Sequence, residues 1–75
     1  MEIPLYEYIK EKEKIATLDT TKIYKITFKS GDYDLVHIWD CDLFVELYSF
    51  LSRDFYQISN PEFIELYKKG NIKEV

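Results

Sequence analysis

Two alternating stretches on either side of one turn restrict the fold of this chain more than any other feature of its sequence. In Lys22–Phe28 and in Tyr33–Trp39, large apolar side chains recur at every second position. A strand with one buried face has this period, because successive side chains of a strand point to opposite faces of the sheet. The turn between them, Lys29–Asp32, contains Gly31, which can adopt the positive φ of a tight turn. The sequence therefore predicts a β-hairpin.

The length of the hairpin loop decides which residues of the second strand lie beside the more apolar face of the first. A two-residue loop places Leu35, His37 and Trp39 there, whereas a three-residue loop places Val36 and Ile38 there. The sequence leaves both registers open. Because both faces of the second strand are apolar, we expect this strand to be central in the sheet or covered on both sides.

The segment Leu43–Arg53 is the strongest predicted helix. Asp40 and Asp42 precede it, and such carboxylates are good N-caps that also favour the positive end of a helix. Apolar side chains then fall within one arc of a helical wheel: Leu43, Phe44, Leu47, Leu51 and Phe55. We expect this helix to cover one face of the sheet, with Leu47 and Leu51 in the core.

Two further helices are predicted nearer the ends of the chain. Pro4–Glu13 begins with a proline suited to a first helical turn and carries apolar residues at helical spacing. The motif Ser59-Asn60-Pro61-Glu62 is a helix start, and Gly70 is the expected stop. Residues 71–75 are predicted to be a loose tail. Lys14–Leu18 is either a third strand or an extended lead-in to the hairpin.

These elements predict a small α+β fold. Residues 1–75 provide too few side chains for two hydrophobic cores, so we expect one domain. Its order is an N-terminal helix, an antiparallel hairpin or three-stranded meander, and two helices packed on the sheet. Cys41 is the only cysteine, so the chain cannot close an internal disulfide. Without a long apolar run, we expect a soluble, cytoplasmic protein without membrane contact.

Charge and aromatic content point to a protein partner. The net charge is −4, and residues 40–65 carry six acids against Arg53 alone. This sign disfavours direct binding to nucleic acid and complements a basic protein surface. The seven tyrosines, five phenylalanines and one tryptophan exceed what so small a core hides. Exposed aromatic side chains are the usual anchors of protein interfaces. The residues expected to contact the partner combine both features: Glu46, Tyr48, Asp54, Tyr56, Glu62 and Glu65.

The sequence favours a non-enzymatic protein without a cofactor or a metal. His37 and Asp34 differ by three positions along a strand and so face opposite sides, which separates the best acid–base pair. Cys41 has no base placed to activate it. The acids around His37 lack the spacing of calcium or zinc ligands, and neither glycine lies in a phosphate-binding loop.

The predicted element order, in a small acidic chain, resembles small phage-encoded inhibitors of bacterial defence systems, some anti-CRISPR proteins among them. That resemblance implies an inhibitor that occupies a basic site on a larger protein. The alternative is a structural or regulatory module that forms a homodimer through its surplus aromatic residues.

Overall fold

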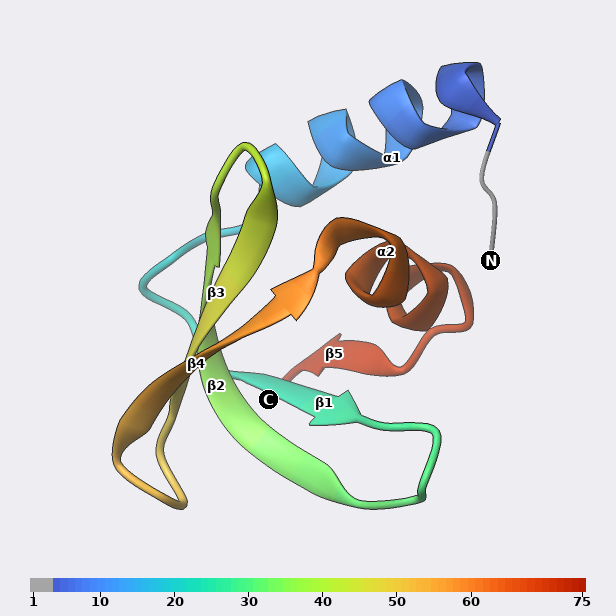
Figure 1. Cartoon of the computed structure of the whole chain (residues 1–75). Coiled ribbons are helices and arrows are strands. Elements are labelled where there is room, and N and C mark those ends of the chain that lie inside the picture. The colour runs from blue at the N-terminus through green and yellow to red at the C-terminus, as the bar shows by residue number, and fades with distance from the viewer. Residues whose placement is uncertain (1–3) are drawn as a thin grey trace.

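Five antiparallel strands form one sheet in the order β4-β3-β2-β1-β5, and two helices lie against one of its faces (Figure 1). This computed structural model describes residues 4–75. Along the chain the elements are α1 (Leu5–Ala16), β1 (Tyr24–Thr27), β2 (Tyr33–Asp40), β3 (Phe44–Ser49), β4 (Asp54–Ser59), α2 (Asn60–Lys68) and β5 (Ile72–Glu74). The α+β class is as predicted, but the order of elements matches the prediction only in part.

The predicted hairpin is confirmed, and its loop sets the register. Phe28 N–H donates to the Asp32 carbonyl at 2.8 Å, and Gly31 has a φ of 92°. Three residues therefore lie between this hydrogen-bonded pair, which is the second of the two predicted loop lengths. Tyr24 pairs with Val36, so Val36 and Ile38 face the core, with exposed fractions of 0% and 1%.

The predicted helix Leu43–Arg53 is wrong. Its first half is β3, a strand paired with β2 on one side and β4 on the other. A two-residue turn precedes it, in which Cys41 and Phe44 exchange backbone hydrogen bonds of 3.0 and 3.3 Å. Asp40 therefore ends β2 and caps no helix. Pairing on both sides gives β3 the same backbone hydrogen bonding that a helix would give, and it also buries alternate side chains.

Besides β3, the structure contains two further strands that the sequence did not predict. The second half of the expected helix contains a turn, with Arg53 at a φ of 58° and Leu51 60% exposed, and β4 follows it. The predicted loose tail, residues 71–75, contains β5, which pairs with β1 through Ile72 opposite Ile26. Both strands extend a sheet that otherwise would end at β3 and β1.

The two terminal helix predictions are confirmed with changed bounds. α1 continues to Ala16, so Lys14–Leu18 forms no third strand. α2 begins as predicted, because the Ser59 side chain accepts a hydrogen bond from Glu62 N–H at 3.3 Å and proline occupies the first turn.

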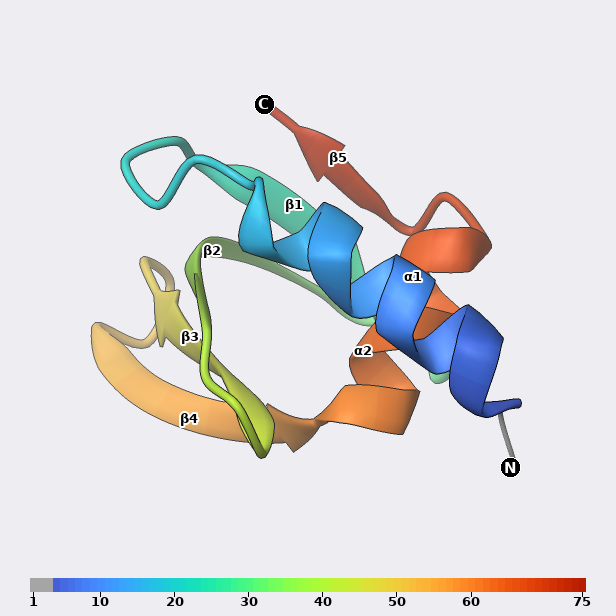
Figure 2. The same ribbon diagram turned by 90° about the horizontal axis from the view of Figure 1, so that it is seen from above.

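The core lies between the two helices and the inner face of the curved sheet (Figure 2). The sheet supplies alternate side chains: Tyr24, Ile26, Val36, Ile38, Val45 and Leu47. The helices supply Ile15, Phe63, Ile64 and Leu66. Because both helices occupy the inner face, the opposite face of the sheet is left to solvent.

Candidate functional site

The outer face of β2, β3 and β4 brings together aromatic residues from three separate parts of the sequence. The strand register aligns His37 with Tyr48 and Tyr48 with Phe55. The neighbouring row aligns Trp39 with Glu46 and Glu46 with Gln57. The residues between these positions point into the core, so both rows point away from the helices.

Five side chains on this side of the sheet are in mutual contact and are called the aromatic face: His37, Trp39, Tyr48, Phe50 and Phe55. The ring centroids of His37 and Phe50 are 4.7 Å apart, and those of Tyr48 and Phe55 are 4.9 Å apart. Most of the pairs meet edge to face, with interplanar angles of 61–89°. Each such pair contributes roughly 0.5–1.5 kcal/mol beyond the area it buries.

The aromatic face remains open to solvent in spite of these contacts. Phe55 is 55% exposed and Phe50 is 37% exposed, while the other three rings are half-buried. Neither helix lies on this side of the sheet (Figure 1). A contiguous apolar patch left open to solvent is the kind of surface on which binding partners dock.

Charged side chains lie at two places on the same side of the sheet. Glu46 is half-buried between Trp39 and Gln57, next to the aromatic face. At the other end, Lys25 on β1 lies directly opposite Lys73 on β5, and both line a pocket of about 150 Å³. The Glu46 carboxylate thus puts a negative charge beside the aromatic face, whereas Lys25 and Lys73 make the β1–β5 end of the sheet positive.

His37 and Asp34 lie on opposite faces of β2, as the sequence predicted. The His37 ring on the outer face has its Nδ1 at 2.9 Å from the Lys22 carbonyl oxygen, so Nδ1 carries the proton and donates. Asp34 accepts hydrogen bonds from the Ser49 hydroxyl at 2.8 Å and from the Tyr56 hydroxyl at 3.0 Å. Burial raises the pKa of Tyr56 far above its usual value, and the hydrogen bond to the Asp34 carboxylate raises it further.

The residues predicted to bind a partner do not form one surface. Glu46 and Tyr48 lie on the outer side of the sheet. Tyr56 points to the inner side, where it packs on the core. Asp54 is at the start of β4, and its carboxylate accepts from Phe55 N–H at 2.8 Å.

The last two predicted site residues are on α2, away from the aromatic face: Glu62 and Glu65. Hydrogen bonds from Lys69 and Lys29 hold the pKa of Glu65 below its usual value. Because Glu46 is on β3 whereas Glu62 and Glu65 are on α2, these three acids do not share one surface. Conversely, the prediction omitted Trp39, Phe50 and Phe55, which only the strand register brings together.

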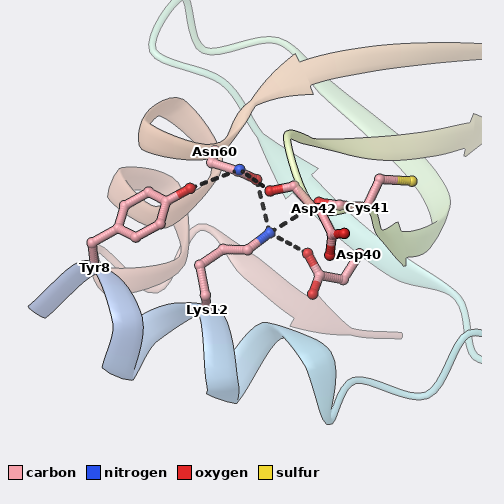
Figure 3. Close-up of polar contacts among 6 residues, drawn as sticks. All are labelled: Tyr8, Lys12, Asp40, Cys41, Asp42 and Asn60. Carbon is pink, nitrogen blue, oxygen red and sulfur yellow. Dashed lines mark hydrogen bonds and ion pairs between the residues drawn. The ribbon is translucent and has the colours of Figure 1, made fainter. Parts of the chain in front are cut away.

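A second polar cluster connects α1 to the rest of the fold (Figure 3). The Lys12 ammonium forms an ion pair with Asp40 and donates to the Cys41 carbonyl and to Asn60 Oδ1, at 3.1 and 2.9 Å. Asn60 Nδ2 in turn donates to the Tyr8 hydroxyl at 2.8 Å. Lys12 has only 14% of its side chain exposed, and every buried side-chain polar atom of residues 4–75 has a partner. The cluster is therefore a fully paired tether between elements.

No protein-family model, curated protein or solved structure matches the chain. Within residues 4–75 no three potential metal ligands of the His, Cys, Asp and Glu types converge. In the same range, no helix has the length and apolar character needed to cross a membrane.

Proposed function

We propose that this chain is a non-enzymatic protein-binding module that holds its partner on the aromatic face. The observation that carries the proposal is the packing of five rings on the side of the sheet that the helices leave uncovered. A small domain gains stability by burying aromatic area in its core, yet Phe55 and Phe50 remain more than one-third exposed. Burying them against a partner supplies the contact energy that aromatic anchors give to interfaces.

The partner surface we propose is apolar at its centre and carries a basic side chain. Glu46 lies directly opposite Trp39, so a carboxylate and an aromatic ring are side by side on adjacent strands. A lysine or arginine of the partner can pair with that carboxylate and contact the ring at the same time. The net charge of −4 attracts such a partner from a distance.

The same geometry disfavours single-stranded nucleic acid as the ligand. Base stacking needs accessible ring faces. Here the rings meet edge to face, so neighbours cover part of each ring face. Glu46 would also repel a phosphate backbone laid across the rings.

The absence of catalysis remains part of the proposal and rests on how the polar groups are used. Lys12 and Asp34 are both committed to partners within the fold. His37 shares no face with Asp34. The resemblance to phage-encoded inhibitors rested on an element order that the structure matches only in part, so it adds no support.

The test compares capture by variants of one immobilised chain. Trp39→Ala and Phe55→Ala remove rings from the aromatic face, and Tyr6→Ala removes an exposed ring from α1 as a matched control, since Tyr6 is 77% exposed. We expect a protein from the native host lysate to bind the wild type and Tyr6→Ala and to be lost from both face variants. Equal capture by all four folded proteins would contradict the proposal.

A further inference from the structure

The outer edge of β4 has backbone groups that no described element uses. β4 is the last strand on one side of the sheet. Figure 2 shows it along the outer rim of the curved sheet, with β3 on its inner side. An unpaired strand edge is a template for the addition of another strand.

The turn before β3 identifies the backbone groups that face this edge. Cys41 and Phe44 exchange hydrogen bonds across the turn, so Phe44 and every second residue after it turn their backbone groups toward β2. The intervening residues of β3 bond to β4, where their partners are the even-numbered positions 54, 56 and 58. The remaining residues of β4 turn their N–H and C=O groups to the open edge: Phe55, Gln57 and Ser59.

Only one of the outward N–H groups is already engaged. Phe55 N–H donates to the Asp54 carboxylate at 2.8 Å. The Phe55 carbonyl, both backbone groups of Gln57 and the Ser59 N–H make no hydrogen bond to another described residue. Within its six residues β4 has no proline and no lysine, the usual devices that protect an edge. The opposite edge is shorter, since β5 has three residues and includes Lys73.

We propose that β4 pairs antiparallel with β4 of a second copy of this chain, about a two-fold axis at Gln57. In this register Gln57 N–H donates to the Gln57 carbonyl of the second copy, and Ser59 N–H donates to its Phe55 carbonyl. Every open group of the edge is then paired, and Phe55 N–H keeps its bond to Asp54. A register centred one residue earlier, on Tyr56, requires the Phe55 N–H, which is already bound to the Asp54 carboxylate.

The two-fold pairing also places the two aromatic faces on the same side of one continuous sheet. Residues directly opposite each other in an antiparallel pair lie on the same side of a sheet. Phe55 and Ser59 are opposite each other in this register, and both point to the outer side. The Phe55 ring of the second copy therefore lies on the outer side of the joined sheet, across from Ser59 and four positions along the strand from Phe55 of the first copy.

Charge complementarity supports a second copy as the occupant. Arg53 immediately precedes β4 and Glu62 is in the first turn of α2, so this antiparallel pairing brings Arg53 of one copy close to Glu62 of the other. Arg53 and Glu62 are both exposed, and neither forms an ion pair with another described residue.

The direct test is the mass of the purified chain by sedimentation equilibrium between about 1 and about 200 μM. We expect twice the chain mass of 9.1 kDa at the upper concentrations. Gln57→Pro removes an N–H from the open edge without removing a bond to β3, so it should give a folded monomer. Gln57→Ala keeps the N–H and should dimerise like the wild type. A monomer at all concentrations, an assembly larger than two copies, or a folded Gln57→Pro dimer overturns the proposal.

A charge exchange decides the question if Gln57→Pro does not fold. Arg53→Glu and Glu62→Arg should each weaken the dimer about tenfold, and the double variant should restore it. Unchanged dimerisation in all three variants excludes this register. Because these measurements use the purified chain alone, their failure leaves the proposed protein-binding role to its own capture test.

Discussion

Trp39 on β2 and Glu46 on β3 lie directly opposite each other on the outer face of the sheet. The chain has one tryptophan, so its fluorescence reports on this position alone among the aromatic residues. Glu46 would meet a basic group of the partner at the same position. Glu46 can therefore be substituted to change the charge at this position, and the fluorescence of Trp39 reports binding at the same position.

Reversing the charge of Glu46 should slow the association with the partner. Glu46→Arg removes the attraction for a basic group and should also flatten the salt dependence of the association rate. Glu13→Arg on α1 is the matched control, since both variants change the net charge from −4 to −2. Stopped-flow measurement of Trp39 fluorescence at two salt concentrations gives both rates. Equal slowing by the two variants would mean that total charge, and no local pairing, governs the encounter.

Two leucines that the sequence placed together in the core should differ sharply in their effect on stability. Leu47 is fully buried on β3, whereas Leu51 is 60% exposed in the following turn. Leu47→Ala should lower the free energy of unfolding by about 2–5 kcal/mol, as large-to-small core substitutions do. Leu51→Ala should stay within about 0.5 kcal/mol of the wild type. Urea denaturation of both variants measures the difference, and similar losses would contradict the placement of this segment.

The same segment explains where the sequence was ambiguous. Leu43, Leu47 and Leu51 recur at every fourth position, which favours a helix, while Val45 and Leu47 recur at the period of a strand. Local pattern cannot choose between these periods. The choice depends on the two-residue turn before β3 and on pairing with β2 and β4, which are contacts between different parts of the chain.

Features with a local cause were predicted more successfully. Gly31 lies in the hairpin turn, and Ser59 caps α2, where the sequence expected a turn and a helix start. Of the expected site, Glu46 and Tyr48 are on the outer face, although on a strand. Their neighbours Trp39 and Phe55 are far apart in the sequence, and only the register of three strands brings their rings to a centroid distance of 5.9 Å.

The hydrogen bond from Tyr56 to Asp34 should make stability depend on alkaline pH. The raised pKa of Tyr56 in the fold means that its proton is held more tightly than in the unfolded chain, where the usual value is 10.0. This contribution is fully present below pH 10.0 and is lost as the pH rises above it. Tyr56→Phe should lack that part of the alkaline loss and should be about 0.5–1.5 kcal/mol less stable at neutral pH.

Urea unfolding of wild type and Tyr56→Phe across the alkaline range measures the pH effect, because the other titrating groups are common to both proteins. Tyr33→Phe is the control, since Tyr33 is 54% exposed. Parallel pH profiles for wild type and Tyr56→Phe would show that the phenol does not interact with Asp34.

The tether at Lys12 should stabilise the contact of α1 with the rest of the fold. Lys12→Met keeps the apolar stem and removes the ammonium group that pairs with Asp40 and Asn60. Their oxygen atoms then lose a charged donor in a half-buried site, so the free energy of unfolding should fall by about 1–3 kcal/mol. Lys10→Met is the control, because Lys10 is exposed and its ammonium group lies 5.8 Å from the Tyr6 ring centroid. Urea denaturation gives the stability change, and hydrogen exchange of the α1 amides shows whether the loss begins at that helix. If Lys12→Met and Lys10→Met are equally stable, the Lys12 cluster does not contribute to the free energy of unfolding. In that case α1 is held by Ile15 and its other core contacts.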